Sequence, residues 1–183
     1  MSAWKHLPDA ILHTWLPGQE EGNAIADVLT GKVNPSGKLP FTIASRYEDY
    51  PSAANFPSSN SNPAEVEYKE GIYVGYRHFD HANISPTYPF GYGLSYTTFK
   101  YDNMTVKTSG DSIIVSVRVK NTGKYPGKES VQLYAPASQD PSAIKELKAF
   151  AKTGLLKPGQ SQTLKMIVSR QDHRNSCDFS LTR

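Results

Sequence analysis

The sequence predicts an α+β chain that consists of a β-α-β unit, an irregular connecting arm and an incomplete β-sandwich. Near the N-terminus, apolar residues at helical spacing lie between two short apolar runs. From about residue 112 onward the pattern changes to strict alternation of apolar and polar residues, which is typical of half-buried strands. Residues 88–99, which contain five aromatic rings, stand between these two patterns.

Two apolar runs frame the first unit. Residues 9–16 are stopped by Pro17-Gly18, and their length favours a buried strand, although periodicity alone leaves a helical turn open. Residues 34–37 carry proline at the second position of a predicted turn. Residues 38–43 then form the second predicted strand.

A short helix is predicted between these runs. Glu20 and Glu21 precede it, where the helix dipole favours negative charge, and Gly31 ends it as a C-terminal cap. Its apolar face is formed by residues at i, i+3 and i+4, namely Ile25, Val28 and Leu29. One β-α-β unit leaves apolar surface uncovered, so the sequence predicts packing partners outside this chain.

The connecting arm begins with residues 46–63, which are rich in Ser, Asn and Pro and predict an irregular surface segment. Residues 71–80 suggest an extended or short helical piece. Residues 88–99 hold too much apolar ring surface for a flexible linker, and we expect an ordered connector packed by its rings.

Three alternating runs predict the sandwich: residues 113–120, 130–134 and 163–168. Lys157-Pro158-Gly159 is a predicted turn. Residues 169–183 are polar, and no further strand is predicted there. The strand count is therefore below the seven or so that such a sandwich uses.

Composition excludes several classes of function. A net charge of +3, scattered along the sequence without a basic run, predicts no nucleic-acid partner. The longest apolar runs are too short for a membrane span. The single cysteine, Cys177, excludes an internal disulfide and a cysteine-based metal site, and no cofactor is predicted.

The compartment is left open. The first residues lack the basic-then-apolar order of a signal peptide. Asn83 and Asn103 begin triplets that fit N-glycosylation, and whether either is modified is also open; Pro86 weakens the first.

At the level of motifs the chain resembles the family 3 glycoside hydrolases. WLPGQEEGNAIADVL at 15–29 and NPSGKLP at 34–40 are similar to the end of the family's second domain. EGIYVGYR at 70–77 and YPFGYGLSY at 88–96 resemble the arm that follows. KELKAF at 145–150 and LKPG at 156–159 resemble the fibronectin type III-like domain that ends many members.

The resemblance implies a domain division. Residues 1–45 would end the α/β sandwich domain, and residues 46–97 would form the connecting arm. Residues 98–183 would form an immunoglobulin or fibronectin III-like β-sandwich that lacks its last strands.

The resemblance also implies a retaining β-glucosidase-like enzyme that hydrolyses terminal β-linked sugars with two carboxylates about 5–5.5 Å apart. The family's nucleophile is an aspartate in a Ser-Asp-Trp type motif on an N-terminal barrel, whereas Trp4 and Trp15 follow Ala3 and Thr14 here. The family's acid/base glutamate lies upstream of the segment that begins at Trp15. No catalytic residue is therefore predicted, and the chain alone is expected to be inactive.

The implied partners are the N-terminal barrel, the remainder of the α/β domain, and the oligosaccharide or aryl β-glycoside substrate of the parent enzyme. Family members are commonly secreted. Which sugar is preferred, the oligomeric state, and whether the chain is a short natural protein or a shortened one are left open. A stand-alone carbohydrate- or protein-binding sandwich is the alternative function, and a stray reading frame without a role is a third possibility.

Other candidate groups were weighed against structural roles. Glu20 and Glu21 are adjacent and point apart, so a catalytic pair is not predicted. His78 and His81 flank Asp80, but further metal ligands are lacking and a surface loop is favoured. Cys177 is interpreted as an incidental thiol. Four rings could stack on sugar, although packing is favoured: Tyr68, Tyr73, Tyr76 and Tyr92.

Overall fold

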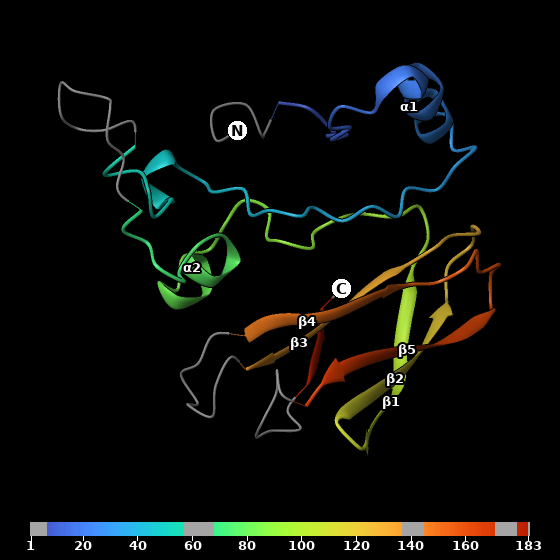
Figure 1. The fold of residues 1–183 in the computed structure, drawn as a ribbon. Coiled ribbons are helices and arrows are strands. Elements are labelled where there is room, and N and C mark those ends of the chain that lie inside the picture. The colour runs from blue at the N-terminus through green and yellow to red at the C-terminus, as the bar shows by residue number, and fades with distance from the viewer. Residues whose placement is uncertain (1–6, 57–67, 137–144, 171–178, 183) are drawn as a thin grey trace. The chain divides into compact units, whose positions relative to one another are not determined.

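The computed structural model describes residues 7–56, 68–136, 145–170 and 179–182 (Figure 1). Its helices are α1 (Glu21–Leu29) and α2 (Tyr76–His81), with short 3-10 turns at Gly18–Glu20 and Tyr47–Asp49. Its strands are β1 (Phe99–Ser109), β2 (Ser112–Asn121), β3 (Ser130–Pro136), β4 (Lys145–Lys152), β5 (Ser161–Ser169) and β6 (Ser180–Thr182).

The chain separates into two compact units. The first unit combines Met1–Asp9 with Leu39–Tyr92, and the second unit combines Ala10–Lys38 with Gly93–Arg183. None of the helices in the described residues is long and apolar enough to cross a bilayer.

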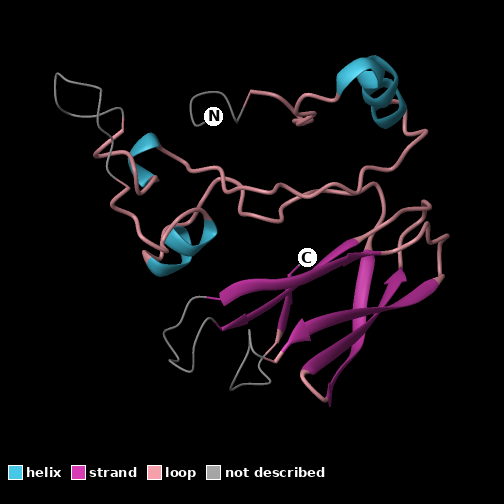
Figure 2. Ribbon diagram, in the orientation of Figure 1, coloured by secondary structure: helices cyan, strands magenta, loops and turns pink. Residues whose placement is uncertain are grey.

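The second unit contains a β-sandwich. Two antiparallel three-stranded sheets, β1-β2-β5 and β4-β3-β6, face each other (Figure 2). The predicted alternation is confirmed for β2 and β5, in which every second residue points into the core. β3 alternates as far as Leu133, and Tyr134, which follows a register irregularity, is buried as well. The largest fully buried apolar side chains are Leu133, Val115, Val117, Val119 and Val131. An α+β chain dominated by a sandwich is thus confirmed.

The prediction that no strand follows β5 was wrong. β6 pairs antiparallel with β3, Leu181 lying opposite Leu133, and Phe179 joins the buried core. Three residues suffice because they add to a central strand that is already formed. Such a short strand could not be recognised from the sequence, because residues 169–183 are polar as a whole.

Two of the predicted strands do not form. Residues 9–16, the first predicted strand, contain no helix or strand, and Leu16 is 95% exposed. Both sheets of the described chain consist of β1–β6 alone, so this run has no neighbouring strand to accept its backbone hydrogen bonds.

Residues 38–43 form only an irregular pairing with residues 88–92. Leu39 and Ile43 donate their backbone N–H groups to the carbonyl oxygens of Tyr92 and Tyr88, both at 2.8 Å. Pro40 removes a donor from this ladder. The connector from 88 onward is therefore ordered, as expected, and its first part belongs to the first unit.

The helix predicted from Ile25, Val28 and Leu29 is confirmed as α1. Gly31 follows it at φ +76°, a left-handed conformation that favours glycine just beyond a helix end. Leu29 remains 68% exposed, so the described chain leaves part of the apolar face uncovered. For residues 71–80 the helical alternative holds from Tyr76 onward, where α2 begins, whereas residues 71–75 form turns and irregular structure.

Candidate functional site

The most highly organised polar cluster of the second unit is a junction between residues 34–38, 93–101 and 121–130, which we call the 34–38 junction. The segment after α1 was predicted to turn at residues 34–37, but it runs on without a turn. The prediction was wrong because the side chain of Asn34 makes its hydrogen bonds to distant segments, where a turn would need local ones.

Asn34 connects three segments. Its Oδ1 accepts hydrogen bonds from Ser95 Oγ and from the backbone N–H of Tyr96, both at 2.9 Å. Its Nδ2 donates to the carbonyl oxygen of Pro126 at 3.0 Å. The position needs an acceptor and a donor in one side chain, which an amide supplies and a carboxylate does not.

A buried ion pair lies beside this amide. Lys38 Nζ lies 3.4 Å from Glu129 Oε1 and donates to the carbonyl oxygen of Gly93 at 3.0 Å. Tyr101 donates its hydroxyl hydrogen to Glu129 at 2.7 Å. The side chains of Lys38 and Glu129 are only 10% and 7% exposed, so each charge depends on the other for compensation.

Glycines bring the backbones of the junction close together. A Cβ atom at Gly127 would lie 2.7 Å from Asn34 Nδ2 and 2.9 Å from Thr97 Cγ2. A Cβ atom at Gly93 would collide with the carbonyl oxygen of Gly37. Residues 34–38 can therefore approach the end of the sandwich only because these positions lack side chains.

Asn121 completes the network at the end of β2. It is fully buried, accepts from Thr97 Oγ1 at 2.8 Å, and donates to the carbonyl oxygens of Tyr125 and Leu156, each at 2.8 Å. Such an arrangement of paired donors and acceptors rigidifies a junction. The hydrogen bonds of the junction therefore hold residues 34–38 against the end of the sandwich.

The four tyrosines considered as possible sugar contacts do not form one cluster. Tyr68 is 92% exposed. Tyr73 stacks on His81 with ring centroids 4.1 Å apart, whereas Tyr76 packs against Phe90 at 5.0 Å and Tyr92 against Tyr88 at 5.1 Å. An open depression of about 360 Å³ contains none of the four; it is lined by Leu147, Lys148, Ile167, Val168 and Ser169.

The acidic and histidine candidates have local partners. Glu20 accepts a 2.6 Å hydrogen bond from Asn23 at the start of α1. His78 Nε2 lies 3.1 Å from the carbonyl oxygen of Asp49, while His81 stacks on Tyr73. Within the described ranges no three His, Cys, Asp or Glu side chains are placed to hold a metal ion. Cys177 and Trp4 lie outside these ranges.

The fold and the junction define a class: a fibronectin type III-like sandwich to whose end a preceding segment, residues 34–38, is fixed. Comparison with known proteins agrees. Residues 129–178 match the fibronectin type III-like domain, and residues 1–76 match the glycosyl hydrolase family 3 C-terminal domain. The chain belongs to the family 3 glycosyl hydrolases, and both the predicted family and the predicted fold class are confirmed.

Relatives cover most of this chain. Beta-glucosidase B of Emericella nidulans is 47% identical over 172 residues, which are 87% of this chain and 20% of that protein. Thermostable beta-glucosidase B of Acetivibrio thermocellus is 45% identical over 174 residues, 92% of this chain and 22% of that protein. The chain spans about a fifth of the length of the curated relatives it matches.

Solved structures show the same relation. The structure of beta-glucosidase 3B from Thermotoga neapolitana in complex with α-D-glucose superimposes with a TM-score of 0.86 and 47% identity, covering 94% of this chain and 24% of that one. The 34–38 junction joins the two matched regions, since Asn34 and Lys38 belong to the first and Glu129 to the second.

Sequence reasoning missed the residues of the junction. Asn34, Lys38 and Glu129 have no periodic pattern, and their pairing spans more than ninety positions. The one available signal was the motif at 34–40, which was interpreted as a turn and a strand.

Proposed function

We propose that this chain has a structural role as the C-terminal part of a retaining, β-glucosidase-like glycoside hydrolase that acts on terminal β-linked sugars. The 34–38 junction carries the proposal: it fixes residues 34–38, which we assign to the α/β domain, to the sandwich through a buried ion pair and an amide that both accepts and donates hydrogen bonds. In this proposal both catalytic carboxylates come from parts of the parent enzyme outside this sequence.

We further propose the domain division 1–45, 46–97 and 98–183, in which the sandwich braces the end of the α/β domain. The partner of the exposed apolar surface near α1 is then the remainder of that domain. Several large apolar side chains there are exposed, which a folded chain ordinarily covers: Ile11, Leu12, Leu16, Leu29 and Val33.

A chimera tests this function. In beta-glucosidase 3B of Thermotoga neapolitana, the part that aligns with this chain is replaced by this chain, so that the relative supplies everything upstream. We expect a folded enzyme that hydrolyses an aryl β-glucoside. The same chimera with Asn34→Ala and Lys38→Ala should lose thermal stability and activity together, whereas the exposed-site control Lys124→Gln should lose neither.

A folded but inactive chimera would contradict the proposal. So would a chimera in which the junction substitutions leave melting temperature and turnover unchanged.

Of the four tyrosines, we propose Tyr68 as the sugar contact to test first. Its ring is exposed, whereas the other three rings already pack on neighbours. Tyrosine fluorescence followed during titration with cello-oligosaccharides should respond in the parent sequence and not in Tyr68→Ala. A flat response in both rejects this contact.

A further inference from the structure

The outward face of the β1-β2-β5 sheet is strongly basic. In β2 the odd-numbered residues from Ile113 to Asn121 are buried, so the even-numbered residues point away from the core. The strand register places one carboxylate, Asp102, on this face with five exposed cations: Lys100, Lys107, Arg118, Lys120 and Lys165. The face therefore carries +4, more than the +3 of the whole chain.

The strand register gathers charges that are scattered along the sequence. Lys100 lies directly opposite Lys120, and Lys165 lies opposite Ser116. Lys107 ends the row that contains Ile114 and Ile167. Six residues of β2 separate the first row from this last one, which gives a stripe about 20 Å long at the usual rise per residue.

This arrangement is unfavourable for the sandwich itself. Like charges directly opposite on neighbouring strands destabilise a sheet, as at Lys100 and Lys120. Asp102 is held by Arg118, whose Nε and Nη2 donate to its two carboxylate oxygens at 2.6 and 3.0 Å. None of the four lysines forms an ion pair with a described residue.

The polar groups between the lysines suit a carbohydrate chain. Hydroxyl side chains occupy the rows with the cations: Thr105, Ser116, Ser161 and Thr163. At one end Ile167 is 67% exposed and offers an apolar contact for a sugar ring. The outward positions of the described strands β1, β2 and β5 contain no aromatic ring on which a nucleobase could stack.

We propose that the outward face of the β1-β2-β5 sheet binds an anionic polysaccharide, a polymer of uronic acids, through Lys100, Lys107, Lys120 and Lys165. Carboxylates of the polymer pair with the ammonium groups, and its hydroxyls exchange hydrogen bonds with the Ser and Thr rows. The face would thus hold the chain on an acidic carbohydrate surface, a role separate from hydrolysis.

The test is binding of the full 183-residue chain to polygalacturonate by affinity electrophoresis or calorimetry. We expect binding at low ionic strength that weakens steeply above about 0.1 M salt, where the Debye length falls to about 10 Å. Fully methyl-esterified polygalacturonate, which keeps the hydroxyls and lacks the charges, should not bind.

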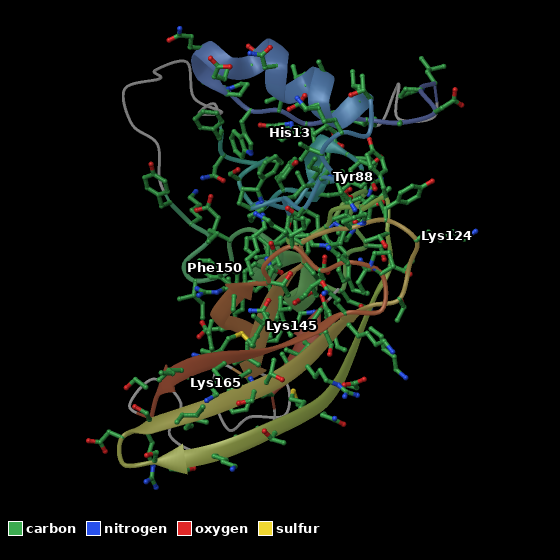
Figure 3. All side chains as sticks on the ribbon, turned by 90° about the vertical axis from the view of Figure 1, so that its right-hand side faces the viewer. His13, Tyr88, Lys124, Lys145, Phe150 and Lys165 are labelled. Atoms are coloured by element: carbon green, nitrogen blue, oxygen red, sulfur yellow. The ribbon has the colours of Figure 1, made fainter. Side chains whose placement is uncertain are left out.

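Two triple variants with equal net charge distinguish binding by this face from binding that depends only on the total charge of the protein. Lys100→Gln/Lys120→Gln/Lys165→Gln should weaken binding at least tenfold. Lys32→Gln/Lys124→Gln/Lys157→Gln, at exposed positions elsewhere, should change it less than twofold; Figure 3 shows Lys124 far from Lys165. Unchanged circular dichroism and melting curves verify that both variants fold.

The proposal is overturned if the unmodified chain does not bind polygalacturonate at low salt, or if the two triple variants lose affinity equally. Equal or tighter binding of single-stranded DNA of the same charge also overturns it, because the face would then recognise any polyanion.

Discussion

Single polar side chains decide how residues 34–38 are held against the end of the sandwich. Asn34 makes hydrogen bonds of ordinary length to residues more than sixty positions away along the chain, and Glu129 forms its ion pair with the still more distant Lys38. A sequence gives no sign of such partners, because Asn, Lys and Glu are ordinarily found exposed. The residue scale is therefore where prediction from sequence was poorest.

The buried ion pair gives the first prediction. Glu129→Gln leaves the Lys38 ammonium buried without its counter-charge, and breaking such a pair costs about 3 kcal/mol of unfolding free energy. Gln still accepts the hydroxyl hydrogen of Tyr101. Urea unfolding measures the loss, and Lys38→Met combined with Glu129→Gln should recover most of it. If Glu129→Gln left the free energy of unfolding unchanged, the ion pair would contribute nothing to stability.

Acid stability gives the second prediction. The hydrogen bond from Arg118, followed by the charges of Arg118, Lys100 and Lys120, holds the pKa of Asp102 below its usual range, and partial desolvation opposes this shift. Because the folded pKa lies below the unfolded one, the unfolded state binds more protons there. The stabilisation is present above the unfolded pKa of about 3.9 and is lost as the pH falls through the folded pKa.

Asp102→Asn should therefore flatten the decline of the melting temperature between neutral pH and pH values below about 4. The measurement is a series of thermal melts for both proteins at fixed ionic strength. Parallel curves for the variant and the unmodified chain would contradict the shifted pKa.

At the scale of elements, strands were predicted correctly where apolar and polar residues alternate along the sequence. β2 and β5 alternate cleanly, β3 alternates as far as Leu133, and the inward residues of these strands form the core. β1 carries a register irregularity between Asp102 and Thr105, and β4 presents small alanines inward, so neither shows a clear pattern. Residues 9–16 failed because a strand requires a neighbour, which composition does not reveal. Residues 38–43 failed because their pairing with residues 88–92 is irregular and Pro40 lacks a backbone donor.

The close approach of elements at the junction gives the third prediction. Gly127→Ala forces a methyl group against Asn34 and Thr97, and overpacking of this kind costs about 1–3 kcal/mol. Gly22→Ala is the control, because its Cβ meets open space within α1 and alanine is the better helix former by about 1 kcal/mol. Chemical denaturation should therefore show opposite signs for the two substitutions. Equal changes in unfolding free energy for Gly127→Ala and Gly22→Ala would contradict the close packing at the junction.

At the scale of the whole molecule, similarity supplies what periodicity could not. Motifs at 15–29, 34–40 and 88–96 pointed to the family from the sequence alone, and the matched domains confirm it. The basic face, in contrast, could not be predicted from the sequence. The net charge of +3 does not reveal a face that carries +4, which became visible only with the strand register. What a sheet gathers on one face depends on which residues of neighbouring strands lie opposite one another, and that register is known here only from the structure.

The central claim is that this chain contributes structure, and no catalytic carboxylates, to a β-glucosidase-like enzyme. The direct measurement is turnover of an aryl β-glucoside by the purified 183-residue chain, with substitution of its acidic residues one at a time. We expect no turnover above the uncatalysed rate. Turnover that one Asp→Asn or Glu→Gln substitution abolishes would place the active carboxylate in this sequence and contradict the account.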